Sequence, residues 1–424
     1  MVGEDLDSYA PPDYKEDVLH QTLQDKNVLV ISHRYNHFTK EQIDRIAKFV
    51  NEIHVYARYN RFTDLSRFID SETLKKNGTH DRIAEESPEN VYVHTTPLTY
   101  LPLDFWYRHL GRQHYRAVKR QVDANSVDFD LIHTHFAWTA GYAGSRLSED
   151  LGIPCVTTIH ENESRLTSYL ESDNSLIHGG LRRADALIRV NKKDCRPLSK
   201  LNDSVYHIPN GYSRERYPLL DTQTAREQLG ISMDTKVIFS LGALLPRKNF
   251  DMLIEAVSEI DSDENILCAI GGRGSEKERL ESKMQEMDTD NGLELLGFIP
   301  EDRLHLWMNA CDIFALSSNS EGNPTVLFEA LGCGKPYVGT NVGGVDEVIV
   351  SEDYGLLCSP GETGELKKQL EKALQRNWNE AQILEYASRF TWESIAHHVC
   401  NVYVDSLSSD VESITKRTPS EVNT

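Results

Sequence analysis

Short, continuous apolar runs recur along this chain and alternate with stretches of helical spacing. In the first half the runs lie at 27–32, 53–58, 91–97, 130–135, 155–160, 186–191 and 205–210. In the second half they lie at 236–242, 266–272, 293–299, 312–318, 336–341 and 355–360. Strands that are buried on both faces read as continuous apolar runs, so the pattern predicts parallel sheets with helices on each side.

The stretches between the runs support this interpretation. The stretch 249–260 places its apolar residues at helical spacing, and 301–310 and 324–332 have a similar pattern. The fold class that the pattern predicts is α/β, with two doubly wound, Rossmann-like domains that face each other across a cleft. Ligands of such sheets bind outside the carboxyl ends of the strands, so we expect the chemistry in loops that follow strands.

A chain of 424 residues is too long for one core, and the two sets of strands predict two domains. The polar stretch 213–228 looks like the linker between them, which places the boundary near 212–230. The predicted parts are a loose N-terminal arm (1–24), a first Rossmann-like domain (25–212), a second (213–385), a terminal helix (386–405) and a disordered tail (406–424).

Composition narrows the class of protein. Hydrophobic residues make up 39% and charged residues 26%, an ordinary balance for a soluble globular protein. No apolar run reaches the ~18 residues of a membrane span, and the acidic start is unlike a signal peptide. The formal net charge of −21 argues against nucleic acid as a partner, since a phosphate backbone would be repelled. We therefore expect a cytoplasmic protein.

The seven cysteines favour reduced core thiols. None of them stands in a CxxC pair, and their spacing supports no zinc site.

The loop with the most candidate chemistry joins a predicted strand to a predicted helix and contains Glu321, Gly322, Asn323, Pro324 and Thr325. Asn323 is a good N-cap, and Pro324 suits the first helical position. The free N–H groups of such a helix start suit a phosphate or a sugar hydroxyl, and Gly322 lets the backbone approach a ligand.

Two carboxylates frame this helix start. Glu321 precedes the helix, and Glu329 lies inside it, with a rise of about 7 Å from Pro324 to Glu329. Each carboxylate can accept hydrogen bonds from two neighbouring hydroxyls, as a sugar and a ribose offer. The alternative is a capped helix with one solvated acid. The glycines at 332, 334, 343 and 344 favour a ligand site.

Several segments together carry a family resemblance. SNSEGNPTVLFEALGCGKPYVGTNVGGVDEVI resembles the donor-site signature of the retaining GT-B glycosyltransferases of family 4, also called group 1. LGALLPRKNFDMLIEAV is similar to that family's basic diphosphate loop, and AIGGRGSEKERLE to its second glycine turn. LRRADALIRVN and IPNGYSRERY resemble the second half of the first domain, and ASRFTWESIAHHVCNVY resembles the terminal helix that crosses back to it.

The resemblance implies a retaining glycosyltransferase that moves a sugar from a UDP-, GDP- or similar nucleotide sugar to a glycan or a lipid-linked acceptor. It assigns the first domain to the acceptor and the second to the donor. The residues that it assigns to catalysis are Lys248, Arg247, Glu321 and His160. Those that it assigns to donor binding are Glu329, Gly322, Asn323, Pro324, Thr325, Gly272 and Arg273.

In this scheme Lys248, with Arg247 beside it, neutralises the diphosphate leaving group. Glu321 contacts the hydroxyls of the transferred sugar, Glu329 binds the ribose, and His160 approaches the sugar from the opposite domain. No cofactor or metal is expected, because the basic loop takes the role of Mg²⁺ and no Asp-x-Asp pair follows a strand. For His133 and His135, a place in the core or along the cleft competes with a catalytic role.

The sequence departs from the family pattern in two places. Ala243 follows Gly242 where the family usually has an arginine, and the glycine pair expected after the first strand is missing from 32–37. Arg247, Arg34 or Arg273 could replace the lost charge. These departures keep open a non-catalytic relative that binds a nucleotide sugar or partners an active enzyme. A sugar epimerase or phosphorylase is a third option, although no pyridoxal-binding lysine motif is present.

The segment 105–120 stands out in this acidic chain, because it holds five Lys or Arg and no acid. Arg108, Arg112, Arg116 and Arg120 recur at four-residue spacing, so a helix would display them as one basic stripe. With the aromatic residues at its start, this stripe suits an anionic membrane surface. The alternative is a solvated helix face whose aromatic residues belong to the core. A peripheral contact at the inner face of the membrane thus remains open.

Overall fold

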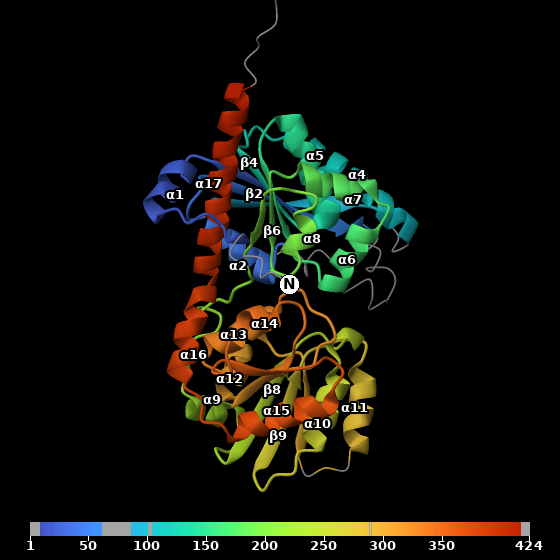
Figure 1. The fold of residues 1–424 in the computed structure, drawn as a ribbon, viewed down its shortest axis with the longest axis vertical. Coiled ribbons are helices and arrows are strands. Elements are labelled where there is room, and N and C mark those ends of the chain that lie inside the picture. The colour runs from blue at the N-terminus through green and yellow to red at the C-terminus, as the bar shows by residue number, and fades with distance from the viewer. Residues whose placement is uncertain (1–8, 62–85, 101–103, 288, 290, 417–424) are drawn as a thin grey trace, which may run out of the picture. The chain divides into compact units, whose positions relative to one another are not determined.

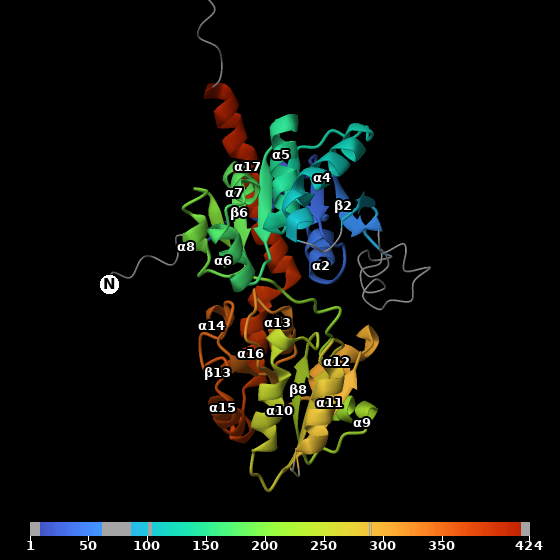
Figure 2. The same ribbon diagram turned by 90° about the vertical axis from the view of Figure 1, so that its right-hand side faces the viewer.

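The computed structural model describes residues 9–61, 86–100, 104–287, 289 and 291–416 of the chain. They form two compact units (Figures 1 and 2). The first comprises the described residues up to Pro209 together with those from Trp392 onwards, and the second comprises Asn210–Thr391. The chain therefore leaves the first unit and returns to it after completing the second.

The first unit is built on a seven-stranded sheet in the order β3-β2-β1-β4-β5-β6-β7. Every neighbouring pair of strands is parallel. The strands are β1 (Asn27–Ser32), β2 (Glu52–Asn60), β3 (Val91–Leu98), β4 (Leu131–His135), β5 (Cys155–Ile159), β6 (Ala186–Arg189) and β7 (Val205–His207).

Helices cover both faces of this sheet. On one face lie α1 (Glu16–Leu23), α2 (His37–Ile46) and the long α17 (Trp392–Lys416), seen side by side in Figure 1. On the other face lie α4 (Asp104–Asp123), α5 (Tyr142–Leu151) and α7 (Ser175–Arg183). The shorter elements are the π-helical turn η3 (Ala137–Gly141), α6 (Glu163–Glu171) and α8 (Cys195–Leu198).

The second unit is built on a six-stranded parallel sheet in the order β10-β9-β8-β11-β12-β13. Its strands are β8 (Thr235–Leu241), β9 (Asn265–Gly271), β10 (Gly292–Gly297), β11 (Ile313–Leu316), β12 (Tyr337–Thr340) and β13 (Gly355–Cys358). Its helices are α9 (Thr222–Leu229), η4 (Pro246–Lys248), α10 (Phe250–Ser258), α11 (Lys277–Glu286), α12 (Glu301–Ala310), α13 (Thr325–Gly332), α14 (Val345–Val348), α15 (Thr363–Gln375), α16 (Glu380–Ala387) and η5 (Ser388–Phe390).

The continuous apolar runs are explained by burial on both faces. In β1, Val28 and Val30 join the core beneath α17, whereas Leu29 and Ile31 join the core beneath α4 and α5. In β8 of the second unit, Phe239 packs on the side of α12 and α13 and Ile238 on the side of α10 and α15. The predicted fold class, α/β with two doubly wound parallel sheets, is confirmed.

The first 24 residues do not all form a loose arm. Residues Glu16–Leu23 form helix α1, and Leu19 and Leu23 are buried against the core that α17 shares. The physical reason is the four-residue spacing of these two leucines, which places both on one helix face.

The polar stretch 213–228 is not a free linker, because it belongs to the second unit, which begins at Asn210. Tyr217 within it and the preceding Tyr212 are buried, and Thr222–Leu229 forms α9. Its buried Arg226 hydrogen-bonds the carbonyls of Ala310, Met233 and Thr235 and forms an ion pair with Asp312. Arg226 thus anchors this stretch to the second unit and is not exposed to solvent.

The terminal helix also differs from its predicted bounds of 386–405. The helix α17 begins at Trp392 and continues to Lys416, into the stretch predicted as a disordered tail. Neither glycine nor proline interrupts this range, so helix propagation has no local reason to stop at residue 405. The rest of the predicted tail, 417–424, lies outside the described residues.

Within the described ranges, no helix is both long and apolar enough to span a membrane. All seven cysteines are buried thiols.

Candidate functional site

Three loops of the second unit follow strands and therefore lie at the carboxyl edge of its sheet. One runs from the end of β8 into η4 and contains Arg247 and Lys248. The second connects β11 to α13 and contains Glu321, and the third follows β12 and contains Gly343. These loops bring together residues that lie far apart in the sequence.

Glu321 is the centre of this cluster, and its carboxylate is almost completely enclosed, with 6% of the residue exposed. Lys248 Nζ lies 2.5 Å from Glu321 Oε1, and Arg247 Nη1 donates to Oε2 at 2.9 Å. The hydroxyl of Ser318 donates to Oε1 at 2.7 Å. Both carboxylate oxygens thus accept from charged donors.

These contacts decide the charge state of Glu321. Burial by itself would raise the pKa of this carboxyl, but the positive charges of Lys248 and Arg247 and the hydrogen bonds outweigh it. The pKa of Glu321 is therefore lowered, and the carboxylate is ionised at neutral pH. The site holds a buried cation and a buried anion in contact before any ligand is bound.

Backbone contacts hold the basic loop against the acidic one. The Ser317 hydroxyl donates to the carbonyl of Asn249 at 2.8 Å, and the Asn319 N–H donates to the carbonyl of Arg247 at 2.8 Å. These bonds join the two loops that carry Lys248 and Glu321.

Two glycines are required by close backbone packing at this edge. Gly343 has φ 55°, and a Cβ there would lie 2.1 Å from the carbonyl oxygen of Glu321. Gly272 has φ 150°, and a Cβ there would lie 1.8 Å from the carbonyl oxygen of Gly242. Contacts within the protein thus account for both glycines, independently of any ligand.

The start of α13 differs from the predicted cap. The helix begins at Thr325 with Pro324 in the capping position, and no side chain caps it. Asn323 instead accepts a hydrogen bond from the Asn210 N–H at 2.8 Å through its Oδ1, and its carbonyl accepts from Asn210 Nδ2 at 2.7 Å. The expected capping oxygen is therefore engaged by a residue that stands 113 positions earlier.

Glu329 is buried in α13, with 7% of the residue exposed. The hydroxyl of Tyr217 donates to its Oε2 at 2.7 Å. Sequence reasoning missed Tyr217, because it stands in the stretch that we interpreted as a linker. Its only signal was a large aromatic residue inside a polar segment.

Three arginines could replace the charge that is missing at Ala243, which is itself exposed. The Arg247 side chain, 41% exposed, contacts Glu321, whereas the Arg273 guanidinium lies over the ring of Phe298 at 4.2 Å. Arg34 is exposed in the first unit. Of the two candidates in the second unit, only Arg247 shares an acid with Lys248 among the described residues.

His160 follows β5 at the carboxyl edge of the first unit's sheet. Its Nε2 lies 2.9 Å from Nδ1 of His135, and the two rings are stacked. Burial, with the nearby His135 and Arg189, lowers the pKa of His160 well below its usual range. The ring is therefore neutral at pH 7, and its approach to a donor sugar remains a prediction.

His133 and His135 differ in their surroundings. His133 hydrogen-bonds the Thr158 hydroxyl at 2.8 Å and the Tyr403 hydroxyl of α17 at 2.6 Å, which makes it part of the core. His135 contacts His160, and burial lowers the pKa of His135 to about 3. Hence His135 is a contact of His160, whereas His133 makes its hydrogen bonds within the core.

Polar residues that the sequence did not single out also lie at this edge. The hydroxyl of Thr139 accepts from Arg58 Nη1 at 2.9 Å and lies 2.9 Å from His114 Nδ1. Glu161 accepts from the Ala137 N–H at 2.9 Å, and burial raises the pKa of its carboxyl. They come from distant parts of the chain, so no local motif marks them.

The basic stripe of 105–120 lies on α4. Arg108, Arg112, Arg116 and Arg120 are exposed. Leu110 of the same helix is buried, and Gly111 lies so close to Trp138 that a Cβ would come within 2.5 Å of the ring. The side chains of 105 and 106 lie outside the described residues. Helix α4 therefore exposes its arginines on one face and packs Leu110 and Gly111 against the first unit on the other.

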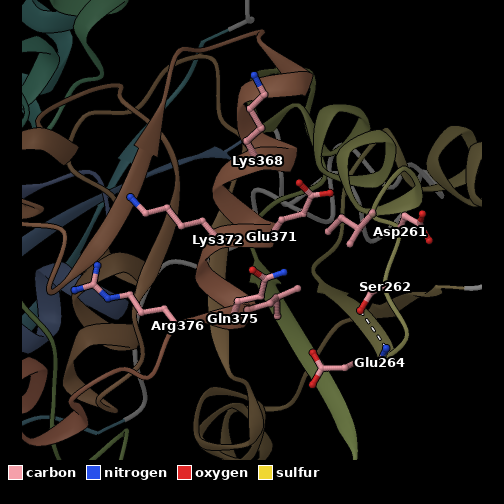
Figure 3. A pocket seen from close by; sticks show the side chains of 10 residues that line it. Asp261, Ser262, Glu264, Lys368, Glu371, Lys372, Gln375 and Arg376 are labelled. Atoms are coloured by element: carbon pink, nitrogen blue, oxygen red, sulfur yellow. Dashed lines mark hydrogen bonds between the residues drawn. The ribbon is translucent and has the colours of Figure 1, made fainter.

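A cavity of about 500 Å³ lies elsewhere on the second unit (Figure 3). It is lined by the connection from α10 to β9, including Asp261 and Glu264, and by Lys368, Glu371 and Lys372 of α15. Because residues 261–264 precede β9, the cavity lies at the amino edge of the sheet. It is thus separate from the cluster around Glu321.

Two family models match the chain. The model of glycosyltransferase family 4 matches residues 28–216, and the model of glycosyl transferases group 1 matches residues 221–390. The chain belongs to the group 1 glycosyltransferases.

Individual members are distant. An uncharacterised glycosyltransferase of Methanocaldococcus jannaschii is 26% identical over 343 residues, which cover 77% of this chain and 88% of the relative. Sucrose-phosphate synthase of Thermosynechococcus elongatus superposes with a TM-score of 0.73 at 19% identity, covering 91% of this chain and all of that one. HepE of Anabaena, solved with UDP and glucose, has a TM-score of 0.62 at 19% identity and covers 92% of this chain and 99% of its own. These structures show that this group 1 glycosyltransferase has the GT-B fold.

In the described part of this glycosyltransferase, no three His, Cys, Asp or Glu side chains gather in a way that could hold a metal ion.

Proposed function

We propose that the protein is an active, retaining glycosyltransferase whose donor is a nucleoside-diphosphate sugar. The observation that carries the proposal is the buried cluster in which Lys248 and Arg247 converge on Glu321 at the carboxyl edge of the second sheet. A diphosphate needs fixed positive charge. Lys248, with 7% of the residue exposed, supplies such a charge at this edge of the sheet.

In this proposal the residues of the cluster have separate roles. Lys248 and Arg247 stabilise the negative charge that gathers on the departing diphosphate, which is usually the largest catalytic contribution. Glu321 receives hydrogen bonds from the transferred sugar, and the backbone of Gly322 to Thr325 faces the sugar and the β-phosphate. Glu329, eight residues after Glu321, binds the ribose.

The reaction breaks the bond between the anomeric carbon of the sugar and the β-phosphate oxygen. The acceptor hydroxyl forms its new bond on the same face of the sugar and gives its proton to the departing phosphate. The neutral His160 then acts as a hydrogen-bonding group for the donor sugar rather than as a cation. With two cationic side chains at the diphosphate, we propose that the transfer needs no metal.

The nature of the donor is supported by HepE, which was solved with UDP and glucose and with UDP-glucose. For this chain we propose a UDP-, GDP- or similar nucleotide sugar as donor and a glycan or lipid-linked acceptor. The exposed arginines of α4 fit a peripheral contact with anionic lipid at the inner face of the membrane.

Donor hydrolysis and transfer with a panel of nucleotide sugars, with and without EDTA, test the proposal. We expect turnover of at least one donor, unchanged by EDTA, and NMR of the product should show the donor's anomeric configuration. The alternative, a non-catalytic relative, is motivated by Ala243 in place of an arginine and by the missing glycine pair after the first strand, and it predicts donor binding without turnover. An inverted product would refute retention alone.

A further inference from the structure

The segment 210–217 contacts α13 at both of its ends. At the start of the helix, Asn210 makes its two hydrogen bonds with Asn323. At the end of the helix, the ring of Tyr212 lies against Gly332, where a Cβ would come within 2.2 Å of the ring. Between them, the hydroxyl of Tyr217 donates to Glu329. This segment therefore sets where α13 and its acidic side chain lie.

The contact of Tyr217 with Glu329 is enclosed. Tyr217 is 1% exposed and Glu329 is 7% exposed. Burial, and then the negative charge of Glu329, raise the pKa of Tyr217 well above its usual range. The phenol consequently stays protonated and remains a hydrogen-bond donor throughout the working pH range.

A hydrogen bond from a neutral hydroxyl to a buried carboxylate is short and strong, because the acceptor carries a charge. At 2.7 Å it fixes Oε2 and with it the plane of the carboxylate. A glutamate side chain otherwise loses considerable rotamer freedom when a ligand orders it. Tyr217 imposes this order before the ligand arrives.

We propose that Tyr217 is a positioning residue for Glu329 and thereby determines how strongly the enzyme recognises the ribose of its donor. This inference rests on the proposed function, in which Glu329 binds the ribose. Tyr217 itself touches neither the phosphates nor the transferred sugar in this scheme. Its loss should therefore weaken binding of the nucleotide more than it slows the chemical step.

The test uses Tyr217→Phe, which keeps the ring and removes only the hydroxyl. UDP, GDP, ADP and CDP, each with its 2′-deoxy counterpart, are titrated into the intact protein by calorimetry. We expect the variant to bind the preferred ribonucleotide about tenfold more weakly, in line with the loss of one charged hydrogen bond. Binding of the 2′-deoxy counterpart should change much less, so the preference for ribose shrinks.

Tyr206→Phe is the matched control. Tyr206 donates to the carboxylate of Asp405 at 2.7 Å, which is the same kind of bond in the first unit and outside the candidate site. This variant should keep the affinity and the ribose preference of the wild type. In transfer assays, Tyr217→Phe should raise the donor KM and leave kcat within about threefold, as expected for loss of uniform binding.

A double-mutant cycle separates positioning from general damage and also removes the buried charge that could prevent Tyr217→Phe from folding. In a Glu329→Gln background, Tyr217→Phe should have no further effect on nucleotide affinity. An equal loss for ribose and deoxyribose, or an unchanged affinity in Tyr217→Phe, overturns the inference and leaves the proposed function standing. If the wild type binds none of the four diphosphates, the proposed function fails, and the inference fails with it.

Discussion

Lys248 Nζ lies 2.5 Å from Oε1 of Glu321, and each side chain is only 8% exposed. This contact joins two loops that are 73 residues apart in the sequence. Removing one partner of a buried ion pair leaves an uncompensated charge, which is costly, whereas replacing both with apolar groups can be neutral. Lys248 therefore influences both stability and the proposed chemistry, and experiments must separate the two.

Lys248→Ala should lower kcat by about a hundredfold or more, because its charge matters most as the diphosphate leaves. Glu329→Ala should instead raise the donor KM, because ribose contacts are similar in the ground and transition states. Steady-state kinetics with the best donor of the panel measure both effects. Unchanged kinetics in both variants would show that the site is misassigned.

A double variant controls for stability in this experiment. Lys248→Met combined with Glu321→Gln removes both buried charges, so its melting temperature should lie above that of Lys248→Ala alone. It should nevertheless remain inactive. Activity that returns together with stability would mean that Lys248 has only a structural role.

Arg247 and Arg34 are the candidates for the charge that Ala243 does not supply. Changing both to Gln should abolish transfer, while the melting temperature stays nearly the same, because both arginines are exposed and Lys248 still pairs with Glu321. The single variants show which arginine matters, and the contact of Arg247 with Glu321 favours Arg247. A fully active double variant would mean that Lys248 alone neutralises the diphosphate.

The buried histidines predict a loss of stability in acid. Burial lowers the pKa of His133, His135 and His160, so each gains a proton on unfolding at any pH between its folded pKa and about 6.5. In that window the unfolded chain binds more protons, and stability therefore falls as the pH falls below about 6.5. Each histidine adds at most about 1.4 kcal/mol per pH unit.

Melting temperatures of the intact protein between pH 7.5 and pH 5 measure this loss. His135→Gln should flatten the dependence on pH, whereas His20→Gln, at a site whose side chain is 48% exposed, should leave it unchanged. The same slope in all three proteins would contradict a buried, neutral His135.

The basic stripe of α4 predicts binding to anionic vesicles. Wild-type protein should co-sediment with them at low salt, and changing Arg108, Arg112 and Arg116 to Gln should abolish this. A control that changes the exposed Arg182, Arg183 and Lys200 to Gln removes the same charge from another surface. Equal pelleting of both variants, or no pelleting of the wild type, would rule out a membrane role for the stripe.

The sheets could be predicted from the sequence because burial on both faces leaves a mark that is local. All thirteen apolar runs correspond to strands, seven in the first unit and six in the second. Helix α1 was missed because its acidic surroundings outweighed the spacing of Leu19 and Leu23. The cap at Asn323 was wrong because the N–H of Asn210, far away in the sequence, competes for the same oxygen.

The candidate site could be predicted only as a set of residues. The resemblance pointed to Lys248, Arg247 and Glu321, but their mutual contacts depend on how two loops meet after folding. Tyr217 and His135 had no motif to mark them, because each matters through a partner that is distant in the chain. Gly111 within α4 also had no local signal to explain it, because the ring of Trp138 that requires a glycine there is distant in the chain.

The split first unit has a consequence for biosynthesis. His133 and Tyr403 share a hydrogen bond across 270 residues, and everything between Asn210 and Thr391 must leave the ribosome before α17 can cover its face of the first sheet. At common elongation rates those roughly 180 residues take about 10 to 40 s, during which β1 and its neighbours lack this cover. The unit that is synthesised first is thus completed last, and a nascent chain stalled within the second unit would present that apolar face to chaperones.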